Sequence, residues 1–244
     1  MLVSKRMLAG VTAAIMLLGV GACSSNTATV GSPANPPQVS VVSVSPAESV
    51  KATDISVVES GFSRVGEYWT YAVILENLND HFAARNISVD LTFRDDAGTV
   101  LANTKTFVGY ISPLQRAAIA SQVIEIGGTP TKLEVRATPS NDNWNPPETP
   151  QNSRVDTLYK ISNLAEIAEG YNSRSYTGEV ENSGTEMLDM ISVAIVMRDS
   201  AGRIVGGAST FVDNIPAKGK AAFQISVFPP PEHATVEAYA VLPY

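Results

Sequence analysis

Two stretches of this sequence carry the same pattern and decide its fold. The first reads Ile87-Ser88-Val89-Asp90-Leu91-Thr92-Phe93-Arg94-Asp95-Asp96-Ala97-Gly98, and the second reads Ile191-Ser192-Val193-Ala194-Ile195-Val196-Met197-Arg198-Asp199-Ser200-Ala201-Gly202. In the first stretch apolar and polar residues alternate with a period of two, which is typical of a β-strand with one buried face and one solvated face. The aspartates and glycine that follow favour a tight turn, because carboxylates accept free backbone N–H groups and glycine adopts positive φ. Each stretch therefore predicts the first strand and the turn of a β-hairpin.

The similarity extends outward from both stretches at a nearly constant offset of 104 to 105 residues. Glu76-Asn77 matches Glu181-Asn182, and Thr106-Phe107-Val108 matches Thr210-Phe211-Val212. Chance similarity does not hold register over so long a segment. We therefore predict two copies of one module.

Short apolar runs bounded by turn residues predict six or seven strands in each copy. Those that can be assigned to residues are 55–58, 71–75, 87–93, 100–101, 116–126 and 131–138 in the first copy, and 176–180, 191–197, 204–205, 221–228 and 234–242 in the second. Residues 158–168 also show helical spacing, so strand and helix both stay open there. The pattern predicts an all-β protein with two tandem immunoglobulin-like antiparallel β-sandwiches, and a barrel is the alternative.

The second copy contains Gly178-Glu179-Val180-Glu181-Asn182-Ser183-Gly184 and, after a strand, Arg198-Asp199-Ser200-Ala201-Gly202-Arg203-Ile204-Val205-Gly206. With this pattern it resembles the FxLYD family. The resemblance covers residues 70–126 and 175–228, although Arg94 and Arg198 stand where the family commonly has tyrosine. The family consists of small immunoglobulin-like modules of bacterial and archaeal envelope proteins, often behind lipoprotein signals. It has no known shared catalytic residue, so the resemblance implies none here.

The N-terminal residues predict export and lipid anchoring. Lys5 and Arg6 precede an uncharged apolar run that is shorter than the roughly 20 residues a membrane-spanning helix needs. The run ends in Val20-Gly21-Ala22-Cys23, which resembles the bacterial lipobox. That resemblance implies cleavage before Cys23, acylation of Cys23 and attachment to the outer face of a bacterial membrane. An ordinary secretory signal followed by a chance cysteine is the alternative.

These features divide the chain into five segments. Residues 1–22 are the signal peptide, and residues 23–50 are the lipidated N-terminus with a disordered tether rich in Ser, Thr and Pro. The first sandwich is expected at residues 51–139, a Pro-rich linker at residues 140–153, and the second sandwich at residues 154–244.

The composition excludes several classes of site. Of 244 residues, one is cysteine and two are histidine, so there is no cysteine-based zinc site or internal disulfide. The formal charge of −7 argues against a nucleic-acid partner, which requires a basic face. His81 and His233 lie in predicted loops and are expected to be solvated. No nucleophile elbow, P-loop or dinucleotide fingerprint occurs, so we expect neither enzymatic activity nor a cofactor.

Two sets of residues remain as candidate sites. Asp95, Asp96 and Asp199 are weak candidates for calcium, and turn capping accounts for them better because calcium needs six to eight oxygen ligands. Trp144, Tyr68 and Trp69 are candidates for a contact surface, and packing within or between the modules is the simpler account.

These observations favour a non-enzymatic envelope lipoprotein whose modules contact another envelope protein or polymer. The alternative is a lipoprotein that delivers a small ligand or ion to a membrane complex through a cleft between the modules near Trp144. A closed and filled interface between the modules favours the first interpretation. A pocket lined with Trp144 or Tyr68 favours the second.

Overall fold

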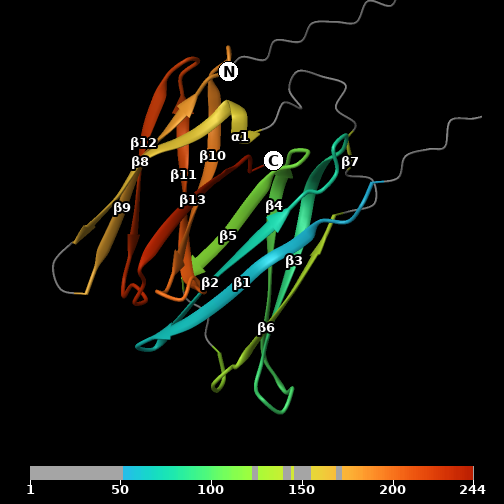
Figure 1. Ribbon diagram of the computed structural model, residues 1–244, viewed down its shortest axis with the longest axis vertical. Helices are drawn as coiled ribbons and strands as arrows, with labels where there is room; N and C mark the ends of the chain where they lie inside the picture. Colours follow the sequence, from blue (N-terminus) through green and yellow to red (C-terminus); the bar gives the residue numbers. More distant parts are fainter. Residues whose placement is uncertain (1–51, 123–125, 140–143, 146–154, 169–171, 244) are drawn as a thin grey trace, which may run out of the picture. The chain divides into compact units, whose positions relative to one another are not determined.

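Antiparallel β-strands provide nearly all the regular structure in the computed structural model, which describes residues 52–122, 126–139, 144–145, 155–168 and 172–243 (Figure 1). The described residues belong to one unit, Ser49–Tyr244. Within them the one helix is the short α1 (Val155–Leu158), and no helix is long and apolar enough to cross a membrane.

The first half contains two sheets that pack face to face. Its strands are β1 (Ser56–Val65), β2 (Tyr68–Glu76), β3 (Ala83–Arg94), β4 (Val100–Ile111), β5 (Arg116–Gln122), β6 (Lys132–Thr138) and β7 (Trp144–Asn145). One sheet has the order β1-β2-β5, and the other has the order β4-β3-β6 with β7 added beside β3.

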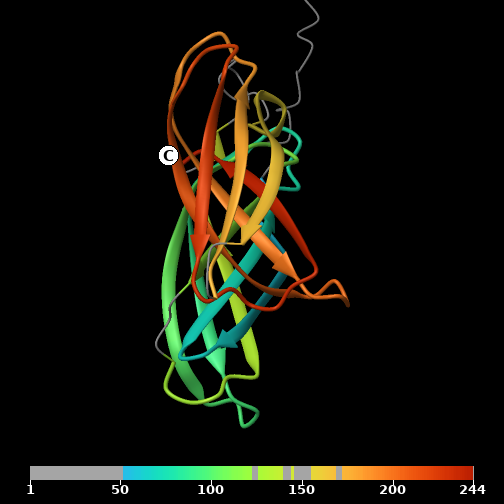
Figure 2. The same ribbon diagram turned by 90° about the vertical axis from the view of Figure 1, so that its left-hand side faces the viewer.

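The described part of the second half repeats this arrangement, except that β7 has no counterpart there (Figures 1 and 2). Its strands are β8 (Tyr159–Ala168), β9 (Arg174–Asn182), β10 (Leu188–Arg198), β11 (Ile204–Ile215), β12 (Lys220–Val227) and β13 (Thr235–Val241). The sheets β12-β9-β8 and β11-β10-β13 match the two sheets of the first half. The predicted all-β fold with two tandem sandwiches is therefore confirmed.

The predicted alternation places the core of each half between its two sheets. Ile87, Val89, Leu91 and Phe93 are fully buried, as are Ile191, Val193, Ile195 and Met197. Both hairpins also carry a bulge at the same place, immediately before Arg94 and before Arg198. The repeat predicted from the sequence therefore includes the pairing register of the strands and the position of the bulge.

The segment whose state the sequence left open is mostly strand. β8 pairs with β9, but its register shifts between Ser162 and Ala165, and Asn163 has a φ of 55°. This bulge lets Ile161 and Leu164, three residues apart, both pack against the core. A bulge thus imitates helical spacing in the sequence.

Part of the expected linker belongs to the first sandwich. Trp144 and Asn145 form β7, which pairs with Ala84 and Ala83 of β3. Trp144 also packs against the first core. Burying a large aromatic surface and satisfying backbone groups favour this strand over a free spacer.

The matched asparagines Asn77 and Asn182 explain one signature of the repeat. Both are fully buried at the end of a strand. The Asn77 amide donates to the carbonyls of Phe82, Ile111 and Ser112, and the Asn182 amide donates to those of Glu186 and Ile215. Each asparagine therefore ties the loop after its own strand to the end of a strand in the other sheet.

Candidate functional site

The two sandwiches meet through one sheet of each. The outer face of the β1-β2-β5 sheet packs against the outer face of the β11-β10-β13 sheet. The residues buried in this junction are Ala72, Ile74, Ala118, Ala120, Ala194, Val196 and Ile204. Because most of these side chains are small, the two backbones approach closely.

Glycines and hydrogen bonds complete the junction. A Cβ atom at Gly61 would overlap the carbonyl of Ile204, and one at Gly207 would overlap Ala120. The Thr70 hydroxyl donates to the Gly207 carbonyl at 3.0 Å and accepts from the Gly207 N–H at 3.1 Å. The junction is therefore filled by apolar contacts and polar pairs rather than by solvent.

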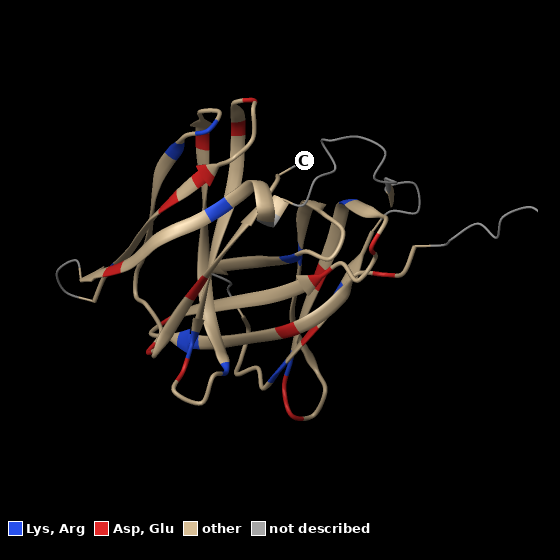
Figure 3. Ribbon diagram, turned by 45° about the horizontal axis from the view of Figure 1, so that its top comes forward, with Lys and Arg blue, Asp and Glu red and all other residues tan. Residues whose placement is uncertain are grey.

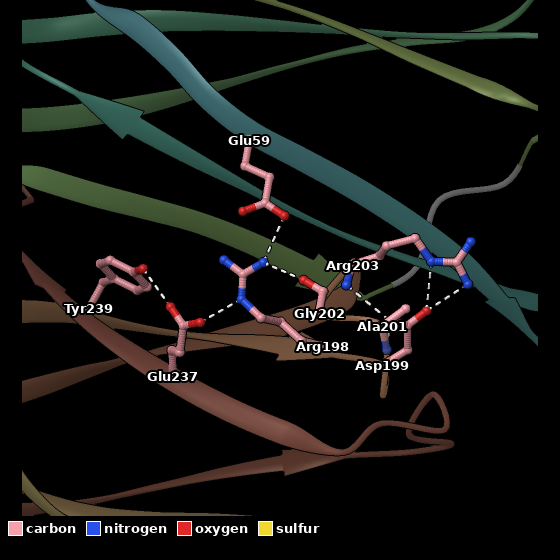
Figure 4. Close-up of polar contacts among 8 residues, drawn as sticks. All are labelled: Glu59, Arg198, Asp199, Ala201, Gly202, Arg203, Glu237 and Tyr239. Atoms are coloured by element: carbon pink, nitrogen blue, oxygen red, sulfur yellow. Dashed lines mark hydrogen bonds and ion pairs between the residues drawn. The ribbon is translucent and has the colours of Figure 1, made fainter.

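Arg198 is the charged centre of one edge of this junction (Figure 4). Its Nη1 donates to Glu59 Oε1 of the first sandwich at 2.7 Å and to the Gly202 carbonyl at 2.8 Å. Its Nε donates to Glu237 Oε1, and Glu237 Oε2 accepts from the Tyr239 hydroxyl at 2.7 Å. Three strands and one turn thus converge on a single guanidinium.

Burial and hydrogen bonds shift the pKa values of Arg198, Glu237 and Tyr239. The hydrogen bond to Glu59 raises the pKa of Arg198 above its ordinary value, although burial opposes this. Burial acts to raise the pKa of Glu237, but the hydrogen bonds from Tyr239 and Arg198 outweigh it and leave that pKa low. Burial and the neighbouring Glu237 raise the pKa of Tyr239 to about 12. The cluster is therefore held with Arg198 and Glu237 charged and Tyr239 neutral.

Arg94 of the first sandwich makes the matched contacts to the last strand and to the hairpin turn. Arg94 Nε donates to Glu134 Oε2 at 2.7 Å, and its Nη1 donates to the Gly98 carbonyl at 2.9 Å. The arginine in each copy thus joins the last strand of its sheet to its hairpin turn. In the second copy the same arginine also reaches across the junction to Glu59.

A hollow of about 510 Å³ lies at the edge of the junction, beside this cluster. Its lining includes Glu59 and Phe62 of β1, Leu133 of β6, and Asp199 and Arg203 of the β10–β11 turn. Asp199 is paired with Arg203 at 2.7 Å. The lining thus combines apolar side chains with paired charges, and neither Trp144 nor Tyr68 is part of it.

The calcium candidates lie in hairpin turns. Asp95 Oδ1 accepts the Thr99 N–H at 2.8 Å, and Asp199 Oδ1 accepts the N–H groups of Ala201 and Arg203. Hydrogen bonds from Arg203 hold the pKa of Asp199 below its ordinary value. Within the described ranges no three His, Cys, Asp or Glu residues gather as metal ligands. The calcium alternative for Asp95, Asp96 and Asp199 stays a prediction.

The three aromatic candidates are not brought together. Trp69 is 7% exposed and packs on Phe62, with ring centroids 5.7 Å apart. Its neighbour Tyr68 is exposed, and Trp144 lies in β7 against the first core. Trp69 and Trp144 thus pack within the first sandwich, and Tyr68 alone presents much of its ring to solvent.

The expectation of a solvated His233 is wrong, because its side chain is only 8% exposed. Its Nδ1 lies 2.8 Å from the Pro231 carbonyl, which can only accept, so Nδ1 carries a proton. Its Nε2 lies 3.1 Å from both the Tyr176 hydroxyl and Glu166 Oε2. The segment before β13 thus meets β8 and β9, which lie far before it in the sequence. His81, in contrast, is exposed beside Asp80. Cys23 lies outside the described residues.

An exposed phenylalanine recurs at the same position of both sandwiches. Phe107 of β4 is 66% exposed and Phe211 of β11 is 59% exposed. Each lies opposite a serine on the neighbouring strand, Ser88 and Ser192 respectively. Acidic and basic residues are interspersed along the strands and turns of both halves (Figure 3). This repeated pair of exposed rings is the more distinctive surface feature.

No protein-family model and no curated protein matches this chain. Among solved structures it is similar to red sea bream transglutaminase, with 12% identity over 78% of this chain and 29% of that chain, at a TM-score of 0.21. It is also similar to the N-terminal CBM22-1-CBM22-2 tandem domain of Paenibacillus barcinonensis Xyn10C, with 12% identity over 81% of this chain and 93% of that chain, at a TM-score of 0.17. The chain thus spans less than a third of the transglutaminase, and likenesses at these scores carry no inference about function.

Proposed function

We propose that this chain is an exported, lipid-anchored envelope protein whose two joined sandwiches form a non-enzymatic binding element for another envelope protein or polymer. The resemblance of residues 20–23 to a lipobox supports the anchor, and the resemblance to FxLYD modules supports the envelope setting. Two or three acyl chains, at about 0.8 kcal/mol per buried methylene, hold a protein firmly on a bilayer. The partner is recognised by the sandwiches and not by the anchor.

The observation that carries the binding role is the pair Phe107 and Phe211. An exposed phenylalanine is ordinary when it occurs once. Here the same exposed ring is present in both copies, while neighbouring outward positions such as Asp90 and Ala194 differ. The filled junction fixes the two sandwiches to each other, so the two rings are presented on one rigid body.

Mass spectrometry of detergent-extracted protein tests the anchor. We expect a mature N-terminus at acylated Cys23, and a Cys23→Ala variant that leaves the membrane fraction. An unmodified N-terminus, or one beyond residue 23, contradicts the anchor.

Crosslinking in intact cells tests the binding role. We expect a crosslinked species that is formed by the full chain and lost in the Phe107→Ser/Phe211→Ser double variant. The matched control is Leu78→Ser/Met187→Ser, which removes two equally exposed apolar side chains from loops. Equal crosslinking by both double variants contradicts a role for the phenylalanine pair.

The hollow beside Arg198 supports a second candidate, a small ligand carried to a membrane complex. Its volume of about 510 Å³ is of the size that small ligands occupy. Ligand retained by the purified protein in native mass spectrometry, and lost after Ser60→Trp fills the hollow, supports this candidate. A mass that matches the bare chain in both proteins favours the binding element.

A further inference from the structure

The contact between the two sandwiches is heterologous, because it joins two different faces of the same module. The first sandwich contributes its β1-β2-β5 face, and the second contributes its β11-β10-β13 face. A contact of this kind leaves one unused face of each type. These unused faces are the outer side of β4-β3-β6 in the first sandwich and that of β12-β9-β8 in the second. We call them the free faces.

The strand registers give the matched position of every junction residue. Ala72 pairs with Gly61 and Ala120, and at the same place Thr177 pairs with Ala165 and Gln224. Ala194 pairs with Ser209 and Tyr239, and at the same place Asp90 pairs with Lys105 and Arg136. Each joined face can therefore be compared with its free counterpart residue by residue.

Five of the seven residues buried in the junction correspond to polar residues on the free faces. Ala72, Ile74 and Ala120 correspond to Thr177, Glu179 and Gln224, and Ala194 and Val196 correspond to Asp90 and Thr92, whereas Ala118 and Ile204 correspond to Ala222 and Val100. Around them, Gly207, Ser209 and Tyr239 correspond to Asn103, Lys105 and Arg136. The inward-facing residues of the two copies stay apolar. The divergence is therefore concentrated where a further module would dock.

Several polar residues of the free faces are paired on their own face. Lys105 lies 3.2 Å from Asp90, and the Asn103 amide donates to the Thr92 hydroxyl at 3.0 Å. On the other free face Lys220 lies 3.3 Å from Glu179. Docking would bury these groups away from water, which is costly for charged side chains. The side chains of Asn103 and Lys105 would also occupy the space that glycine and serine leave open in the junction.

We infer that the contact between the two sandwiches could recur between the free faces of two copies of the chain, head to tail. The polar residues of the free faces prevent this, so the contact forms once, within the chain. The junction shows that the docking geometry exists. The matched positions show which side chains block its continuation.

Two variants that each convert one free face test this inference. One carries Asp90→Ala, Thr92→Val, Ala102→Gly, Asn103→Gly, Lys105→Ser and Arg136→Tyr; the other carries Ser162→Glu, Ala165→Gly, Thr177→Ala, Glu179→Ile and Gln224→Ala. Every new residue is the one found at the matched position of the other copy. By sedimentation we expect each folded variant alone to be a single chain, and their mixture to form a 1:1 complex with twice the mass. Folded variants that stay separate when mixed, or a variant that associates with itself, overturn the inference.

A second experiment changes the junction instead of the free faces, so its result does not depend on whether the converted free faces fold. Ala72→Thr, Ile74→Glu, Ala194→Asp and Val196→Thr place free-face residues into the junction. We expect both sandwiches to keep their strand content while small-angle scattering shows an increased radius of gyration. An unchanged radius overturns the inference. Unfolding of the strands overturns it as well, because the opposite copy carries these same residues in folded strands.

Discussion

Arg198 donates through Nη1 to Glu59 Oε1 at 2.7 Å, and this bond joins the end of β10 in the second sandwich to β1 of the first sandwich. Arg94 occupies the matched position in the first copy and has Glu134 and the Gly98 carbonyl as partners. A residue shared by both repeats has thus acquired a further contact in one of them.

A double-mutant cycle on Glu59 and Arg198 measures this contact. We expect Arg198→Ala to lower the free energy of unfolding by about 1–3 kcal/mol, because it leaves Glu237 and Glu59 without their cation. The coupling between the two sites should lie near the lower end of about 0.5–3 kcal/mol, since Glu59 is partly solvated. Urea unfolding of the four proteins gives both values. The Arg94–Glu134 cycle gives the coupling of the pair within one sheet for comparison, and a coupling of zero between Glu59 and Arg198 contradicts the role of Glu59.

Gly178 and Phe223 form a cross-strand pair whose counterpart is Val73 and Ile119. A Cβ at Gly178 would lie 2.6 Å from the Phe223 ring. We expect Gly178→Val to destabilise the protein by about 1–3 kcal/mol through overpacking. Adding Phe223→Ile restores the volume pairing of the first copy and should recover most of the loss. Thermal unfolding of the single and double variants tests this, and an additive double variant contradicts it.

Replacing the buried side-chain amide of Asn77 by a carboxyl group is expected to destabilise the protein strongly. Asn77→Asp replaces an amide that donates to three carbonyls with an oxygen that can only accept when ionised. We expect the free energy of unfolding to fall by more than the roughly 1–3 kcal/mol of an unsatisfied buried group. Asn79→Ala is a useful comparison because it removes a neighbouring amide. Equal effects of the two substitutions in urea unfolding would show that the Asn77 amide has no special role.

In the Arg198 cluster, the stabilising contribution of Glu237 is expected to be lost at low pH and that of Tyr239 at high pH. The low folded pKa of Glu237 gives a contribution that is complete above its unfolded pKa of about 4.3 and is lost as the pH falls through the folded value. The pKa of Tyr239, raised to about 12, gives a contribution that is complete below about pH 10 and is lost as the pH rises toward 12. Unfolding free energy measured against pH should therefore lose part of its acid slope in Glu237→Gln and part of its alkaline slope in Tyr239→Phe. Parallel curves for wild type and either variant contradict the assignment.

The strands and the repeat were predictable because they depend on local alternation and turn chemistry. Residues 87–98 alone define a strand, its buried face and its turn. The state of residues 158–168 was not predictable, since the bulge at Asn163 breaks the alternation. The burial of His233 was equally hidden, because its partners Tyr176 and Glu166 come from distant strands.

The junction is visible in the sequence as a difference between the two copies. Outward positions are polar in the first copy, at Asp90 and Thr92, but apolar in the second, at Ala194 and Val196. An apolar outward face in one copy of a repeat predicts that this face is covered. Phe107 and Phe211 show the limit of the rule, because their rings are apolar and exposed.

The sequence by itself determined that the chain is all-β and is built from two copies of one module. It also carried the lipobox and FxLYD resemblances behind the proposed envelope setting. Strand alternation and turn preferences depend on residues that are close together in the sequence, so they can be predicted without the tertiary structure. Only the tertiary structure decided which two faces join, why Arg198 differs from Arg94, and where Trp144 and His233 lie. Those outcomes depend on complementary volume and paired charge between segments far apart in the sequence, and such matches exist only once both partners are folded.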